Sequence, residues 1–314
     1  MSQEKVTVPK KKAFFTKKRI FIIAMLAYPI LHFLIFWVYV NFNTIVLSFQ
    51  RFSWTQNTEV FAGFDNYTRF FKTIIEGSTQ NLRYAITNSI WFLVFNNFIL
   101  LPISILCAYL FFRKVFGHQV FRVIFFLPNI ISVVVLTMAF RFMFNNSFGP
   151  VVNFLRNVGL ESWVPKNGFF GTVGLSQIMI FVYCLWAGIG YNVLLLSGSI
   201  ARLPQEVLEA GYIDGIGMWR EMVQIVVPMI FPTISTLFIT GSMVMFTLYL
   251  QPMLLTAGGP NGTTYTIAYY IVDMVNNNKP YDAAAAGIVF SIIGIPLIQL
   301  IKWGMEKITP QIEF

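Results

Sequence analysis

Charged residues are scarce in this sequence. Only 11% of its 314 residues are charged, 56% are hydrophobic, and the mean hydropathy is +0.67. Soluble domains carry roughly one-quarter charged residues, so the composition excludes an ordinary soluble protein and predicts an integral membrane protein. Cysteine and histidine are also rare, with two of each. Cys107, Cys184, His32 and His118 show no metal-binding or redox spacing, so we expect packing or surface residues and no metal site.

Motifs for catalysis are missing as well. The dipeptide Gly-Lys never occurs, which excludes a P-loop, and Gly258-Gly259-Pro260 lacks the lysine that a nucleotide-binding loop needs. The long apolar segments contain no carboxylate pair, which argues against an intramembrane protease or a proton relay. We therefore expect that the chain is not an enzyme. If it transports a solute, the energy must come from another protein.

Six apolar segments are long enough to cross a bilayer, which takes about 20 residues. They contain one charged side chain, Arg141. The expected spans are 20–40, 87–112, 123–144, 171–199, 223–250 and 283–301. The first is too long for the apolar part of a signal peptide and lacks a cleavage pattern, so it is predicted to remain as a membrane helix.

Lysine and arginine predict the orientation of these spans. The segments 1–19, 113–122, 200–222 and 302–314 carry 14 of them in 65 residues, against seven in the 104 residues of the intervening loops. Those loops are 41–86, 145–170 and 251–282. The positive-inside rule places the basic set in the cytoplasm, with both termini inside. The cluster in 1–19 is interpreted as a topology signal and acidic-lipid anchor, not as a nucleic-acid site.

The cytoplasmic segment 200–222 has the pattern of folded structure. Pro204 and Glu206 suit the first turn of a helix, and Gly215 with Gly217 allows a sharp turn. From Met218 onward, apolar residues recur at helical spacing. This predicts a helix–turn–helix on the membrane surface, suited to contact with a partner.

Seven positions of this segment resemble the signature E-A-A-x3-G-x9-I-x-L-P of permease subunits of binding-protein-dependent ABC importers. Gly211 replaces the second alanine and Val227 replaces the leucine. The residues that match or replace the signature are Glu209, Ala210, Gly211, Gly215, Ile225, Val227 and Pro228. Weaker stretches, among them Phe121-Arg122 and Leu255 to Pro260, resemble the carbohydrate branch. In that branch the chain is similar to the larger maltose permease subunit without its extra helices and large external domain.

The resemblance implies an all-α integral membrane protein with the six-helix type I ABC importer permease fold. Residues 20–305 would form this domain, between a basic cytoplasmic segment 1–19 and a cytoplasmic tail 306–314. It also implies a bacterial inner-membrane location. The implied partners are a second, non-identical permease, two cytoplasmic ATPases that hold ATP and Mg²⁺, and an extracytoplasmic binding protein that delivers a sugar or oligosaccharide. No cofactor is expected in this chain.

Within this resemblance, the loop 200–222 would dock on the ATPases. Glu209 would pair with a basic residue, Ala210 and Gly211 would permit close approach, and Gly215 would turn the chain. Asp214 either caps the second helix or contacts the partner. The complete set expected for docking is Glu206, Glu209, Ala210, Gly211, Asp214, Gly215, Ile225 and Pro228.

Sugar recognition needs hydrogen-bonding and aromatic side chains within an apolar cavity. The candidates at membrane depth are Asn96, Asn97, Gln177, Tyr183, Trp186, Asn192, Thr240, Ser242, Tyr249 and Gln251. Any one of them is more often engaged in helix contacts. The alternatives are an ABC permease for a phosphorylated polyol, a peptide or a polyamine, and an ion-coupled carrier. The latter predicts an internal repeat or a charged group near the membrane midplane, and the sequence has neither.

Overall fold

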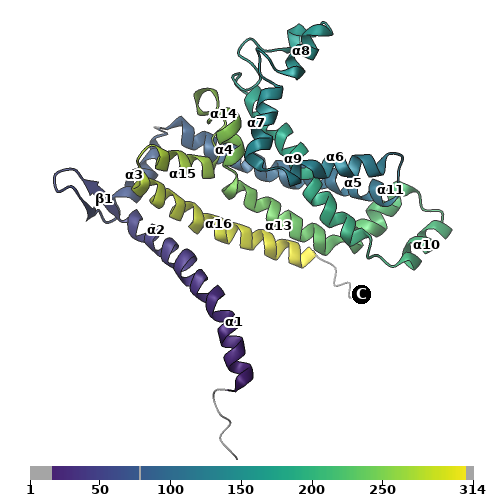
Figure 1. The fold of residues 1–314 in the computed structure, drawn as a ribbon, viewed down its shortest axis with the longest axis horizontal. Helices are drawn as coiled ribbons and strands as arrows, with labels where there is room; N and C mark the ends of the chain where they lie inside the picture. Colours follow the sequence, from purple (N-terminus) through teal and green to yellow (C-terminus); the bar gives the residue numbers. More distant parts are fainter. Residues whose placement is uncertain (1–15, 78, 309–314) are drawn as a thin grey trace, which may run out of the picture.

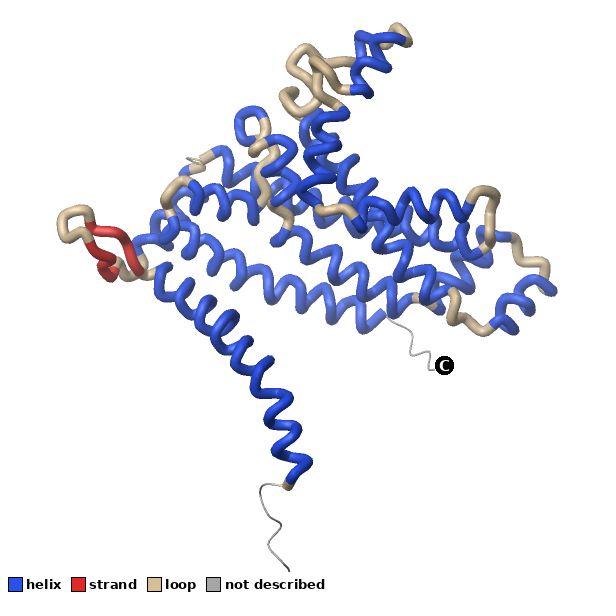
Figure 2. Tube along the Cα trace, in the orientation of Figure 1, coloured by secondary structure: helices blue, strands red, loops and turns tan. Residues whose placement is uncertain are grey.

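The computed structural model describes residues 16–77 and 79–308. Most of the predicted basic segment 1–19 and of the tail 306–314 lies outside these residues. The described chain is mostly helical, as its composition predicts (Figures 1 and 2). A short hairpin in the first long loop adds two antiparallel strands, β1 (Gln50–Ser53) and β2 (Thr58–Phe61).

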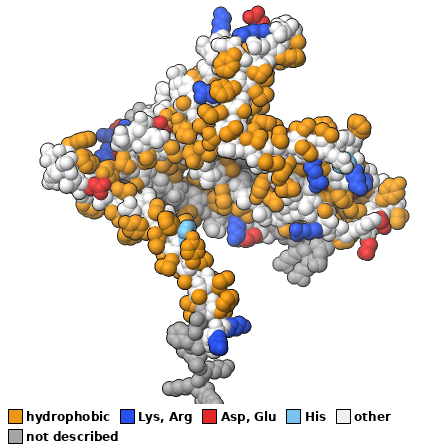
Figure 3. All heavy atoms as spheres, in the orientation of Figure 1, with side chains coloured by type: hydrophobic (Ala, Val, Ile, Leu, Met, Phe, Trp, Pro, Cys, Tyr) orange, Lys and Arg blue, Asp and Glu red, His pale blue; other side chains and the backbone are white. Residues whose placement is uncertain are grey.

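The first span is one continuous helix made of α1 (Lys17–Phe33), a π-helical turn η1 (Leu34–Tyr39) and α2 (Val40–Ser48). It continues past the expected end at residue 40 to Ser48, and two polar side chains in this extension bond to the preceding turn. Asn41 Nδ2 donates to the Trp37 carbonyl at 2.7 Å and Thr44 Oγ1 to the Val40 carbonyl at 3.1 Å. The helix extends away from the rest of the protein, with hydrophobic side chains along its length (Figures 1 and 3).

A polar network joins the end of this helix to the last one. Asn66, in α3 (Asp65–Glu76), donates from Nδ2 to the carbonyls of Ser48 and Gln50, at 2.7 and 2.8 Å. Arg69 Nη2 donates to Asn66 Oδ1, and also to Asp282 Oδ1 at 2.8 Å. Asp282 lies in the first turn of α16 (Pro280–Ile308). Arg69 therefore connects the loop after the first span to the start of the last.

Three more spans are unbroken. The second combines α4 (Gln80–Phe95), η2 (Asn96–Leu100) and α5 (Leu101–Phe112), the fourth is α9 (Leu175–Ile200), and the sixth is α16. The described residues thus contain four helices long and apolar enough to cross a membrane, or up to six if each of two bent pairs is one span.

The two bent pairs correspond to the expected third and fifth spans, which are not straight helices. α6 (His118–Ile130) and α7 (Val133–Met143) meet at 112°. Met218–Met229, which comprises α11 (Met218–Glu221), η4 (Met222–Val226) and α12 (Val227–Met229), meets α13 (Phe231–Thr247) at 77°.

Proline explains where the helices bend. Pro128 lies in the last turn before the first bend, and Pro228 and Pro232 flank the second. Each proline lacks the N–H that would continue the helical hydrogen bonds. The size of each angle comes from the packing around it.

Shorter elements connect the spans. They are α8 (Pro150–Asn157), η3 (Glu161–Trp163), α10 (Gln205–Ile213), α14 (Leu250–Thr256), η5 (Pro260–Gly262) and α15 (Ile267–Asn276). Figure 1 places α10, α11 and the end of α16 toward one end of the long axis, and β1, α3 and α15 toward the other.

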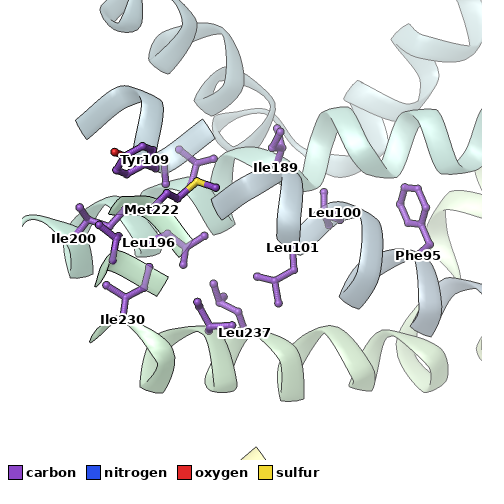
Figure 4. Close-up of a cluster of buried hydrophobic side chains, with 14 residues drawn as sticks. Phe95, Leu100, Leu101, Tyr109, Ile189, Leu196, Ile200, Met222, Ile230 and Leu237 are labelled. Atoms are coloured by element: carbon purple, nitrogen blue, oxygen red, sulfur yellow. The ribbon is translucent and has the colours of Figure 1, made fainter. Parts of the chain in front are cut away.

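The largest buried cluster lies between α5, α9, Met218–Met229 and α13. Tyr109, Ile200 and Met222 gather at one end of it and Phe95 at the other (Figure 4). Because lipid tails are as apolar as leucine, close packing rather than water exclusion holds such helices together. Gly190 of α9 is an example: a Cβ there would lie 2.0 Å from the Phe125 carbonyl oxygen of α6.

Candidate functional site

The segment that resembles the docking loop folds as two helices joined by a tight turn, as the sequence predicts. α10 begins directly after Pro204 and ends at Ile213, and α11 begins at Met218. From there the chain runs through Met218–Met229 into the bundle. The loop is thus continuous with a helix that is packed among the spans.

The turn depends on Gly215. Its φ is +71°, a left-handed conformation that glycine adopts without steric cost. Ile216 N–H donates to the Gly211 carbonyl at 3.0 Å and Gly215 N–H to the Tyr212 carbonyl at 3.1 Å, the hydrogen bonds of a Schellman motif. Gly217 has a φ of −68° and needs no such freedom.

Asp214 occupies the C-cap position of α10, with its side chain exposed. Gly217 is the N-cap residue of α11, so Asp214 does not cap the second helix. Of the two roles that the sequence left open, partner contact is the one compatible with this position.

The inner face of α10 is anchored to the bundle by a close contact. Gly211 is buried, and a Cβ built on it would lie 2.8 Å from Ile225 Cδ1. Leu208 packs against the largest buried cluster. Ile225 and Pro228, which the sequence grouped with the docking residues, are half-buried within the bundle. These two residues pack in the bundle behind the loop and are not part of its exposed face.

The outer face of α10 is exposed and carries both acid and apolar groups. Glu206, Glu209 and Ala210 all face solvent. Gln205 Nε2 donates to Glu209 Oε1 at 2.7 Å. Tyr212 and Ile213 are 79% and 83% exposed, and Trp219 of α11 is 67% exposed. Large exposed apolar side chains gathered beside polar ones mark a site of protein contact.

Sequence reasoning missed an ion pair behind this surface. Arg113 Nη2, just after α5, donates to Glu221 Oε2 at 2.8 Å, and the Glu221 side chain is only 5% exposed. Tyr109, itself buried, donates from its hydroxyl to the Met218 carbonyl at 3.0 Å. The sequence indicates this pair only indirectly: Arg113 follows the second span and Glu221 precedes the fifth, which places both on the same side of the membrane.

The ten polar and aromatic candidates for a solute pathway fall into separate groups. Asn97 Nδ2 donates to Ser242 Oγ at 2.8 Å, which brings η2 and α13 together. Asn96 lies beside this pair on η2 and Thr240 on α13. Asn97 Oδ1 is buried, with no hydrogen-bond partner among the described residues. This first group thus forms a small polar site inside the helix bundle.

A second group lies between α7 and α9. Thr137 Oγ1 donates to the Tyr183 hydroxyl at 2.8 Å, and Trp186 stacks on Phe140 with 6.1 Å between ring centroids. Tyr183 is fully buried, so its hydroxyl bonds to Thr137 within the bundle and does not face a solute. Both side-chain amide atoms of Gln177 are buried without a partner in the described chain.

The remaining candidates are apart from these groups. Tyr249 and Gln251 lie where the helix breaks between α13 and α14. Asn192 is half-buried elsewhere on α9. The described residues also contain no group of three or more His, Cys, Asp or Glu side chains that could hold a metal ion.

Comparison with known proteins supports the resemblance seen in the loop. Residues 100–313 match the model of the binding-protein-dependent transport system inner membrane component family. The chain is 28% identical to the probable ABC transporter permease protein YurN of Bacillus subtilis (strain 168), over 89% of this chain and 95% of that one. It is 29% identical to the arabinooligosaccharides transport system permease protein AraP of Halalkalibacterium halodurans, over 97% and 96%.

Among solved structures, the fold is similar to a bacterial alginate ABC transporter crystallised with an alginate pentasaccharide-bound periplasmic protein. The TM-score is 0.76 at 20% identity, over 93% of this chain and 96% of that one. The family match covers more than half of the sequence and includes the α10–α11 element described above. This chain therefore belongs to the family of inner-membrane components of binding-protein-dependent transport systems.

Proposed function

We propose that this chain is one of two permease subunits of an ATP-driven importer that takes up a sugar or oligosaccharide. The observation that carries the proposal is the α10–α11 element, whose exposed acidic and apolar face is anchored to the bundle core through Gly211 and Leu208. The family membership and the relative named for arabinooligosaccharide transport support the class of solute.

The proposed orientation places both termini and the α10–α11 loop in the cytoplasm. The lysine and arginine distribution supports it. So does the arrangement of α10, α11 and the end of α16 toward one end of the long axis (Figure 1). An extracytoplasmic binding protein would then meet the opposite end, where β1, α3 and α15 lie.

Two cytoplasmic ATPases would supply the energy, because no P-loop occurs in this sequence. ATP and Mg²⁺ would be held on those subunits. Glu206, Glu209 and Asp214 would face basic groups of an ATPase, and Tyr212, Ile213 and Trp219 would fill an apolar groove. Closure of the ATPase pair would move α10 and α11, and the attached helices would switch between two arrangements.

The pathway would run between this chain and the second permease. Of the ten candidates, we propose Asn97 with Ser242, and Gln177, as solute-facing groups. Each has a buried polar atom without a partner in the described chain or lies next to one, and a sugar hydroxyl would satisfy it.

The test is uptake by the reconstituted complex of this chain with its partner permease, ATPases and binding protein. We expect uptake of a labelled oligosaccharide that requires both ATP and the binding protein, and that persists when an uncoupler removes the proton gradient. Uptake abolished by the uncoupler and unaffected by loss of the ATPases would identify an ion-coupled carrier. Binding assays on the purified binding protein would separate sugars from polyols, peptides and polyamines.

A further inference from the structure

Three side chains connect the second span to the helix that follows the docking loop. Arg113 directly follows α5 and pairs with Glu221 of α11 at 2.8 Å. Tyr109, one helical turn before Arg113, donates its hydroxyl to the Met218 carbonyl at 3.0 Å. We call Met218–Met229 the connecting helix. Its first residues are thus held by two contacts, both from the end of α5.

The apolar packing of the connecting helix involves α5, α9 and α13 alike. Met222 and Val226 belong to the buried cluster that also contains Tyr109 of α5, Ile200 of α9 and Ile234 of α13 (Figure 4). The hydrogen-bonded contacts described above go to α5, whereas between the connecting helix and α13 the helix is interrupted at Ile230 and the axis turns by 77°. Across such a break the connecting helix and α13 are two separate helical segments, whereas the ion pair fixes the position of the connecting helix relative to α5.

The electrostatics of the pair argue against a role in stability alone. Removing a carboxylate from water is costly, and a buried ion pair often contributes little net stability compared with apolar residues of the same size. Glu221 is 5% exposed at its side chain, and its Oε1 has no hydrogen-bond partner among the described residues. What such a pair does supply is a fixed relative position of two elements, because shifting either one leaves a buried charge unpaired.

We propose that Arg113, Glu221 and Tyr109 are positioning residues that lock the connecting helix to the second span. Movement of the docking loop then enters the bundle through α5 and not along α13. Ile230 acts as the hinge between the connecting helix and α13. The inference rests on the proposed function, since it concerns how motion from an ATPase reaches the pathway.

The first test measures transport and ATP hydrolysis together in proteoliposomes that contain the complete transporter. For Glu221→Gln and Arg113→Gln we expect assembly with the ATPases to persist. We expect ATP hydrolysis within about twofold of wild type, while solute moved per ATP falls about tenfold, within the range that one residue on a coupling path contributes. The exchanged pair Arg113→Glu with Glu221→Arg should recover part of the loss. If both single variants moved as much solute per ATP as the wild type, the proposal would be overturned.

Asp282→Asn is the matched control. It breaks an arginine–carboxylate pair of the same 2.8 Å length at the other end of the bundle. It should leave the ratio of transport to hydrolysis unchanged. If Asp282→Asn lowered the solute moved per ATP as much as Glu221→Gln does, the proposal would also be overturned, because any broken ion pair would then have the same effect.

A second measurement needs no change to the three residues and serves if the variants do not fold. Spin labels at the exposed positions Lys114 and Val223 report the distance between the end of α5 and the connecting helix. Labels at Val223 and Thr247 report the distance across the hinge. We expect the first distance to stay constant between the nucleotide-free and ATP-bound complexes and the second to change; the reverse result would overturn the proposal.

The two proposals fail in distinguishable ways. A wild-type complex without ATP-dependent uptake contradicts the proposed function. A wild-type complex that transports, combined with an unaltered Glu221→Gln ratio or a variable distance between residues 114 and 223, contradicts only the assignment of the positioning residues.

Discussion

Gly211 of α10 lies directly against Ile225 of the connecting helix, so close that a Cβ at Gly211 would be 2.8 Å from Ile225 Cδ1. Both residues belong to the pattern by which the loop resembles its family, and they are 14 positions apart in sequence. Their contact explains why the spacing matters: it sets how α10 lies on the helix that carries it into the membrane.

This contact predicts a graded response to substitution at Gly211. Gly211→Ala should retain uptake within about twofold, because the atom it meets is the mobile end of a side chain and alanine favours the helix by about 1 kcal/mol. Gly211→Leu should displace α10 and abolish uptake. Adding Ile225→Ala to Gly211→Leu should restore part of it by opening space. Uptake and ATPase co-purification measure both effects, and full activity of Gly211→Leu would contradict the contact.

The left-handed turn predicts a sharper effect at Gly215. Gly215→Val should abolish transport while membrane insertion stays normal, since a branched side chain at a φ of +71° costs at least about 1–2 kcal/mol and tilts α10. Gly217→Ala is the control, because its φ of −68° suits any residue. Normal uptake together with normal ATPase co-purification in Gly215→Val would show that the turn is not needed for docking.

The exposed face of α10 predicts a binding effect without a stability effect. Glu209→Lys reverses an exposed charge that, within residues 16–77 and 79–308, bonds to Gln205 alone, so the melting temperature of the purified chain should stay within about 2 °C. Affinity for the ATPase should fall by about 100-fold or more, since like charges placed opposite each other at an interface cost several kcal/mol. Glu161→Lys, at an exposed site in η3, is the control and should bind normally. Equal binding by both variants would remove Glu209 from the interface.

Packing between α6 and α9 predicts a loss of stability. Gly190→Leu places a side chain where the Phe125 carbonyl already lies 2.0 Å from the Cβ position. We expect the two helices to separate at a cost of about 3 kcal/mol, measured as a lower melting temperature in detergent. Gly198→Ala, with no atom within 4 Å of its Cβ position, should be neutral. An unchanged melting temperature for Gly190→Leu would contradict the close approach.

The sequence predicted local features well where the chemistry of one short segment decides them. The turn at Gly215 and the helices on either side follow from glycine and proline positions within a few residues. The long apolar helices follow from composition. Pro128, Pro228 and Pro232 indicate kinks in the third and fifth spans, but not the size of the bends found there, 112° and 77°.

Features that join distant residues were not predicted. Arg113 and Glu221 are 108 positions apart, and nothing in either segment indicates that the carboxylate is buried. The residues expected to line the solute pathway likewise have partners that the sequence did not indicate. Asn97 finds Ser242 145 positions later, whereas Tyr183 is enclosed between α7 and α9 by Thr137 and Phe140. Polarity at membrane depth indicates that a side chain needs a partner, but not which partner.

The bond between Arg69 and Asp282 has a consequence for biosynthesis. The two residues are 213 positions apart, so Arg69 leaves the ribosome long before its carboxylate exists. During that interval Asn66 can already hold the carbonyls of Ser48 and Gln50, while Arg69 waits for Asp282. This end of the molecule is completed only when the final helix has been made and inserted. In a truncated nascent chain that lacks this helix, Arg69 therefore keeps its bond to Asn66 but has no carboxylate partner.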